Sequence, residues 1–119
     1  MAKYLVEFFE KDDGSEPVKE FLDSLDIKMA AKMMRAIAIL QENGTELREP
    51  YSKNIEDGIF ELRAKVGSDI TRVLYFFFIE RRIILTNGFV KKTPKTPNNE
   101  LEKAKAFRKE YKKREERKL

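Results

Sequence analysis

The feature that most constrains this chain is VLYFFFI at residues 73–79, the longest apolar run in the sequence. It is long enough for a β-strand and far shorter than the ~18 residues that a membrane span needs. The wider segment 70–79 is apolar on both faces, with Arg72 and Tyr75 as its polar exceptions. Such a pattern is typical of a strand at the centre of a sheet. We therefore expect the rest of the chain to build a sheet around this segment.

The neighbouring segments predict the other strands of that sheet. Residues 59–66 alternate, so that one face carries Phe60, Leu62, Ala64 and Val66 and the other carries Glu61, Arg63 and Lys65. Residues 67–69 (GSD) are expected to form a hairpin turn into the central strand, and residues 80–82 a second turn into a strand over 83–90. The β-rich residues 4–9 predict a first strand, and the polar residues 46–57 a loop.

Two helices are expected between the first strand and this meander. Ser15 is the predicted cap of the first helix, with Pro17 in its first turn. Asp26 is the predicted cap of the second helix, which Asn43-Gly44 would end. Spacing predicts that the apolar face of this second helix comprises Ile27, Ala30, Ala31, Met34, Ile37 and Ala38.

A last helix is expected from about residue 100 into the charged tail, where residues 109–119 are expected to fray. The order strand, helix, helix, three strands, helix predicts an α+β fold. This fold would be a small antiparallel meander sheet with an N-terminal helical hairpin on one face and a C-terminal helix. At 119 residues, we expect a single domain that spans 1–119.

The composition excludes several classes of site. With no cysteine and no histidine, disulfides, thiolate chemistry, histidine metal ligands and a histidine base are all ruled out. No dinucleotide or phosphate-binding glycine motif is present, so we expect no metal and no cofactor. The absence of cysteine fits a reducing cytosol, and with no signal or membrane-spanning segment in this sequence we expect a cytoplasmic protein.

Charge is distributed unevenly along the chain. Residues 1–90 carry 13 basic and 16 acidic side chains, whereas residues 91–119 carry 12 basic and 5 acidic ones. This asymmetry favours a polyanionic partner such as nucleic acid. A solvated, lysine-rich helix that keeps the protein soluble explains it equally well.

Cations also gather at the predicted strand ends. Arg63 and Arg72 lie four and five residues from Gly67, so the hairpin would bring them side by side, where an anion or a carboxylate such as Glu61 must separate them. Lys91 and Lys92 end the last strand, and Lys53 lies in the loop that precedes residues 59–66. Taken singly, Arg72 fits a buried ion pair and the two lysines fit edge protection. Together they predict a phosphate site.

Four segments, GIFELR (58–63), TRVLYFF (71–77), ILTNGFVKKTPKTP (84–97) and ELEKAKAFR (100–108), resemble the phage-derived branch of the RelE/HigB-like toxins of type II toxin–antitoxin systems. The resemblance implies a RelE-like microbial ribonuclease fold and an mRNA interferase that acts on the ribosome. It also implies a cognate helix-turn-helix antitoxin, through which the complex would bind operator DNA. Carried over by position, the catalytic residues would be Arg72, Arg63, Lys91, Lys92 and Lys53.

Cleavage by such an enzyme needs no metal, because the 2′-hydroxyl of the RNA attacks the adjacent phosphate. Arginine suits the charge on that phosphate. Lys53, Lys91 and Lys92 are the first candidates for moving protons, and Glu61 is the carboxylate candidate after them. We expect Phe89 to stack on a base, and the RNA backbone to contact Lys95, Lys103, Lys105 and Arg108. Two alternatives remain open at this point: a non-catalytic RNA-binding module, and a protein–protein adaptor with a basic tail.

Overall fold

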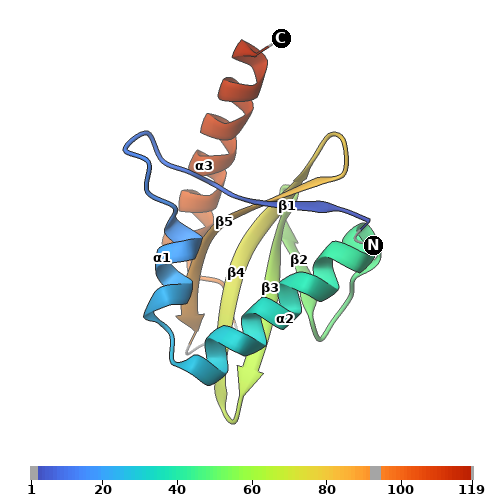
Figure 1. Ribbon diagram of the computed structural model, residues 1–119, viewed down its shortest axis with the longest axis vertical. Helices are drawn as coiled ribbons and strands as arrows, with labels where there is room; N and C mark the ends of the chain where they lie inside the picture. Colours follow the sequence, from blue (N-terminus) through green and yellow to red (C-terminus); the bar gives the residue numbers. More distant parts are fainter. Residues whose placement is uncertain (1–2, 92–94, 119) are drawn as a thin grey trace.

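A single sheet with helices on both faces forms the protein (Figure 1). The computed structural model describes residues 3–91 and 95–118. Three α-helices and five strands follow one another along the chain, with one short 3-10 helix at Gly44–Glu46. The elements are β1 (Leu5–Phe8), α1 (Pro17–Ser24), α2 (Ile27–Asn43), β2 (Ser52–Glu56), β3 (Ile59–Val66), β4 (Asp69–Phe78), β5 (Arg82–Lys91) and α3 (Asn98–Arg117). The predicted α+β class is confirmed.

The sheet is mixed, so the prediction of a purely antiparallel meander is wrong. The strand order is β1-β5-β4-β3-β2, and β4 is central as the apolar pattern of residues 70–79 predicted. Strands β2 to β5 pair antiparallel, but β1 pairs parallel with β5, Leu5 lying opposite Arg82. The β4–β5 hairpin leaves one edge of β5 free, and the N-terminal strand fills that edge. No local sequence pattern reports the direction of so distant a partner.

The segment predicted as a loop contains an additional strand, β2. Of its five residues Ser52 is buried and Ile55 half-buried, because β2 forms an edge of the sheet. Its polar sequence therefore lacks the alternation that identifies a half-buried strand. Asp57 and Gly58 both adopt positive φ (51° and 76°), which suits the tight turn that joins β2 to β3.

One face of the sheet packs against α1 and α2. Leu62, Ala64, Val73, Tyr75 and Leu85 meet the buried residues of both helices there. The buried face of α2 differs from the predicted one, because it comprises Met29, Met33, Ala36, Ile37 and Leu40. Of the predicted face, Ile37 is buried and Ala30 half-buried, whereas the exposed members are Ile27, Ala31, Met34 and Ala38. The helix carries apolar residues around much of its circumference, so spacing alone could not select the buried stripe.

The N-terminal ends of the two helices are only partly as predicted. Asp26 caps α2 by accepting a hydrogen bond from the Met29 N–H at 2.9 Å, as predicted. Glu16, not Ser15, occupies the cap position of α1, and its side chain makes no capping bond. Ser15 instead donates its hydroxyl to Asp13 at 2.6 Å. Ser15 therefore belongs to the turn that precedes α1 and does not cap the helix as predicted.

The opposite face packs against α3, which explains why β4 is apolar on both sides. Ile59, Leu74, Phe76 and Ile84 form the sheet side of this second core. The helix side contributes Leu101, Ala104 and Tyr111. The basic side chains of α3 lie around this apolar stripe. Across residues 3–91 and 95–118, no helix combines the length and the apolar character that crossing a membrane would require.

Ion pairs hold α3 to the sheet at several points along its length. Near its middle, Lys105 contacts Glu56 at 2.7 Å and Arg108 contacts Asp57 at 2.6 Å, so both cations grip the turn between β2 and β3. Further along, Arg114 contacts Asp12 at 2.8 Å. Beyond these contacts the end of the helix projects past the sheet (Figure 1). Much of the positive charge of α3 is therefore neutralised within the protein.

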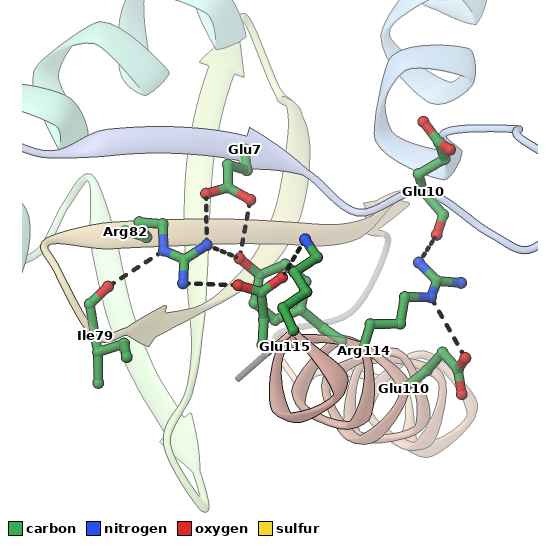
Figure 2. Close-up of polar contacts among 9 residues, drawn as sticks. Glu7, Glu10, Ile79, Arg82, Glu110, Arg114 and Glu115 are labelled. Atoms are coloured by element: carbon green, nitrogen blue, oxygen red, sulfur yellow. Dashed lines mark hydrogen bonds and ion pairs between the residues drawn. The ribbon is translucent and has the colours of Figure 1, made fainter.

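The strongest of these connections centres on Arg82 (Figure 2). Its guanidinium contacts Glu7 of β1 at 3.5 Å and Glu115 of α3 at 2.9 Å, and donates to the Tyr111 hydroxyl at 2.9 Å. Tyr111 in turn donates to Glu7 at 2.9 Å. Burial and the hydrogen bond to Glu7 raise the pKa of Tyr111 above its ordinary value. We call these four residues the Arg82 tie.

Candidate functional site

The two arginines singled out in the sequence lie directly opposite each other. The antiparallel register pairs Arg63 of β3 with Arg72 of β4, as the hairpin predicted. Opposite residues of an antiparallel pair point to the same face of the sheet. That face is the one covered by α3, because Leu74 and Phe76 follow Arg72 at alternate positions and pack there. The local fold thus brings two guanidiniums together beside the start of α3.

A single carboxylate lies between these guanidiniums. Glu61, two residues before Arg63 on the same face, is fully buried. Its Oε1 accepts a hydrogen bond from Arg63 Nε at 3.2 Å and a short one from Arg72 Nη1. Its Oε2 accepts from the Thr96 hydroxyl at 2.8 Å, a residue just before α3. We call Glu61, Arg63, Arg72 and Thr96 the Glu61 cluster.

The two arginines of the Glu61 cluster differ in their access to solvent. The Arg63 side chain is 21% exposed and also contacts Glu49 at 3.4 Å, whereas the Arg72 side chain is 6% exposed. Within the described part of the chain, the buried Nε of Arg72 has no hydrogen-bond partner. Arg63 thus has a second carboxylate partner, the largely exposed Glu49, whereas Arg72 is enclosed within the cluster. Arg63 is therefore the member that can meet an anion from solution.

Two exposed lysines extend this positive charge toward solvent. Lys53 of β2 lies opposite Glu61 in the sheet, which puts its side chain on the same face as the Glu61 cluster. Lys53, Lys95 and Thr96 line a cavity of about 220 Å³ between β2 and the start of α3. Thr96 thus belongs both to the cavity wall and to the cluster. Glu56 also lines this cavity, whereas Arg63 lines a separate cavity against α2, so an anion in the smaller cavity would meet Lys53, Lys95 and Thr96.

The other predicted site residues lie elsewhere. Phe89 is 8% exposed and packs under α3, so its ring has little surface for stacking on a base. Lys105 and Arg108 hold the turn between β2 and β3, and Lys103 contacts Glu100 at 3.7 Å. Lys91 ends β5. Lys92 lies outside the described residues.

Tyr75, the other polar residue of the central strand, belongs to the opposite core. Its ring stacks on Phe60, and its hydroxyl shares a hydrogen bond with Ser52. Burial raises the pKa of Tyr75 to about 12, so the hydroxyl keeps its proton at neutral pH and cannot serve as a base. Tyr75 is therefore a core residue with a satisfied hydroxyl.

Thr96 is the site residue that the sequence did not identify. It stands in the second Thr-Pro pair of GFVKKTPKTP, a stretch in which the lysines drew attention first. The available signal was Glu61, the hydrogen-bond partner of Thr96. Because this carboxylate lies two residues from Arg63, it is on the same face of the strand as Arg63. Within residues 3–91 and 95–118, no cluster of three or more metal-ligating side chains is placed to hold a metal ion.

Comparison with known proteins identifies the family. Residues 20–109 match the family described as Phage derived protein Gp49-like (DUF891), and this match covers more than half of the chain. No curated protein matches the sequence significantly. The matched segment runs from within α1 to the middle of α3 and includes Lys53, Thr96 and the rest of the Glu61 cluster. The chain belongs to the phage-derived Gp49-like family, which is associated with toxin–antitoxin systems.

Proposed function

We propose that this protein is the toxin of a type II toxin–antitoxin system and that it is an endoribonuclease of the RelE/HigB kind. The observation that carries the proposal is the Glu61 cluster, where two arginines on adjacent strands share one carboxylate beside exposed Lys53 and Lys95. Guanidinium and ammonium groups gathered in this way can recognise a phosphodiester. Family membership supports the same assignment.

The proposed reaction uses the 2′-hydroxyl of the RNA as nucleophile. Its oxygen forms a bond to the adjacent phosphorus while the bond from phosphorus to the 5′-oxygen breaks. The products are a 2′,3′-cyclic phosphate and a free 5′-hydroxyl. One group must accept the 2′-hydroxyl proton and another must deliver a proton to the leaving oxygen. We assign these two transfers to the lysines Lys53, Lys91 and Lys92, without an order among them.

The two arginines have different roles in this proposal. Arg63, 21% exposed, contacts the phosphate and stabilises the charge that grows on it during attack. Arg72, 6% exposed, acts as a positioning residue through Glu61, which in turn fixes the Nε of Arg63. Thr96 holds the other oxygen of Glu61. The cluster therefore presents one guanidinium in a fixed orientation, which lowers the cost of binding the transition state.

The proposed substrate is mRNA during translation in the ribosomal A site. The proposed partner is a helix-turn-helix antitoxin that silences the toxin and carries the complex to operator DNA. We also propose a cytoplasmic location, where translated mRNA is found.

The test compares mRNA cleavage by wild type and Arg63→Ala in a translation extract, mapped by primer extension. We expect Arg63→Ala to cleave about 100-fold more slowly, because one preorganised donor to the reacting phosphate is lost. Glu61 keeps its bonds from Arg72 and Thr96 in this variant, so the fold should persist, as thermal unfolding would verify. Lys19→Ala, which removes an exposed lysine of α1, is the matched control and should cleave like wild type.

Cleavage by Arg63→Ala at the wild-type rate would contradict the role of Arg63. If wild type binds ribosomes without cutting mRNA, the protein is a non-catalytic RNA-binding module. If that binding is also insensitive to salt, no phosphate contacts are involved. The protein would then be an adaptor, and the nuclease proposal would be wrong.

A further inference from the structure

A second and larger cavity lies against α2 and shares Arg63 with the Glu61 cluster. It has a volume of about 610 Å³ and lies between α2, the end of β3 with its following turn, and the segment that precedes β2. Its apolar lining includes Ala36 and Ile39 of α2 and Ala64 and Ile70 of the sheet. This volume falls in the range of specific ligand sites, roughly 300–1,000 Å³. We call this cavity the α2 groove.

Cations surround the α2 groove, and among residues 3–91 and 95–118 no carboxylate lines it. The four charged residues in its lining are Lys32, Arg35, Arg63 and Lys65. Among the residues that the structure describes, Lys32, Arg35 and Lys65 have no ion pair or side-chain hydrogen bond. Arg63 contacts Glu49 at 3.4 Å, a carboxylate that is 68% exposed and lies outside the lining. The groove thus differs from α3, where Lys105, Arg108 and Arg114 are neutralised internally.

The sheet has an open edge in the same groove. The last backbone bond between the β2 side and β3 runs from the Arg63 N–H to the Tyr51 carbonyl at 2.8 Å. Just before this point the chain turns away, because the Tyr51 N–H donates back to the Arg48 carbonyl at 3.1 Å. Lys65, two residues beyond Arg63, directs its backbone toward the same edge by strand alternation. In the described structure no strand pairs with β3 at that position.

We propose that the α2 groove binds an acidic, extended peptide segment of a partner protein. Alternate apolar side chains of the peptide would lie on the floor formed by Ala36, Ile39 and Ala64. Its carboxylates would meet Lys32, Arg35 and Lys65, and its backbone would extend the sheet along β3 beyond Arg63. Strand addition supplies affinity through main-chain bonds and specificity through alternate side chains.

The lining favours a peptide over RNA. Apart from Tyr51, which is 44% exposed, the groove offers aliphatic surface and no aromatic ring for base stacking. A peptide in which apolar and acidic residues alternate can place its apolar side chains against the floor of the groove and its carboxylates against the surrounding cations. The proposal does not depend on ribonuclease activity, because it uses α2 and the β3 edge and needs neither Lys53 nor the Glu61 carboxylate.

The experiment is a titration of the ¹⁵N-labelled protein, followed by amide chemical shifts. The probe is the synthetic peptide acetyl-Glu-Ile-Asp-Leu-Glu-Val-Asp-amide. Two matched peptides replace either its acidic residues by lysine or its apolar residues by serine, and an octamer of uridylate represents RNA. We expect saturable shifts at Ala36, Gly67 and Ile70 below about 1 mM probe. We also expect slower hydrogen exchange of the Lys65 amide, which marks strand addition.

Charge-reversal variants test whether the probe binds the α2 groove itself or is attracted by the positive charge of the protein as a whole. Lys32→Glu/Arg35→Glu should weaken probe binding about tenfold or more, because two attractive contacts with the peptide carboxylates become repulsive. Lys28→Glu reverses an exposed lysine of the same helix that does not line the groove, and it should stay within about twofold of wild type. Thermal unfolding should show that the variants remain folded.

Several outcomes would overturn the proposal. One is the absence of saturable shifts at Ala36, Gly67 and Ile70, or shifts confined to Lys53 and Lys95. Equal weakening by Lys28→Glu, or equal binding of the serine peptide, would show unspecific attraction of charge. Tighter binding of the uridylate octamer in the same groove would assign the site to RNA instead.

Discussion

Two charge clusters lie on the α3 face of the sheet, one partly exposed and one largely buried, and their ratios of carboxylates to guanidiniums are opposite. In the Arg82 tie, one guanidinium serves two carboxylates, Glu7 and Glu115. In the Glu61 cluster, one carboxylate serves two guanidiniums, Arg63 and Arg72. The first set of charges joins β1, β5 and α3. The second adjoins, through Thr96, the cavity that Lys53 and Lys95 line.

Under the proposed function, this difference gives the two clusters different roles: the Arg82 tie attaches elements of the fold to one another, and the Glu61 cluster binds phosphate. The Arg82 tie crosses between elements distant in the sequence, and it carries no surplus that would attract an anion. The Glu61 cluster lies mainly within one hairpin, whose backbone already fixes Arg63 opposite Arg72. Its ion pairs are therefore not needed to join elements. They orient a cation, which is what a phosphate site requires.

The largest effect is expected for Arg72→Met, which leaves Glu61 buried, with Arg63 and Thr96 among its remaining partners. Removing one partner of a buried ion pair costs about 3–5 kcal/mol of unfolding free energy, because the other charge stays desolvated. Urea denaturation at neutral pH measures this change. The control is Glu61→Leu/Arg72→Met, which removes both charges and should recover a large part of the loss. If the double variant is less stable than Arg72→Met, the ion pair is not the source of the effect.

A smaller loss is expected for Arg82→Met, which keeps the apolar stem of the side chain. We expect the unfolding free energy to fall by about 2 kcal/mol, the range for hydrogen bonds to charged groups at a partly exposed site. Hydrogen exchange should increase in β1 and in the last turns of α3 more than in the β3–β4 hairpin. Arg117→Met, which removes an exposed cation from the end of α3, is the control. A uniform increase in exchange would argue against a local tie.

The smallest effect concerns alkaline pH. Burial and Glu7 raise the pKa of Tyr111, so the folded state keeps a proton that the unfolded chain begins to lose near pH ~10. The stabilisation is fully present below that pH and falls as the pH rises. Tyr111→Phe removes this dependence. Between pH 8 and 11 the free energy of unfolding of the variant should therefore fall by about 1 kcal/mol less than that of wild type. Tyr75, whose pKa is raised to about 12, contributes equally to both proteins. Parallel pH profiles would place Tyr111 outside the tie.

The parts of this structure that depend on near neighbours could be predicted from the sequence. The central position of β4 follows from its two apolar faces, and the Arg63–Arg72 pair follows from counting away from the Gly67 turn. The role of Glu61 between them follows from strand alternation and from the repulsion of two adjacent guanidiniums.

The parts that depend on distant neighbours could not be predicted in this way. The buried stripe of α2 is decided by the sheet it meets, since Met34 and Met33 are equally apolar and only Met33 is buried. The use of Lys105 and Arg108 depends on Glu56 and Asp57, about fifty residues earlier in the chain. Lys105 and Arg108, which were predicted to contact RNA, therefore form ion pairs within the protein, and no local sequence pattern reveals these partners.

The parallel pairing of β1 with β5 has a consequence for the order of folding. Leu5 pairs with Arg82, 77 positions later, so closing this contact costs more chain entropy than forming any of the hairpins. The β2 to β5 hairpins can form first, and β1 then completes the sheet. During synthesis β1 leaves the ribosome first but must wait for β5. The first strand to be made is therefore among the last to be placed, and until then the free edge of β5 is open to pairing with other chains.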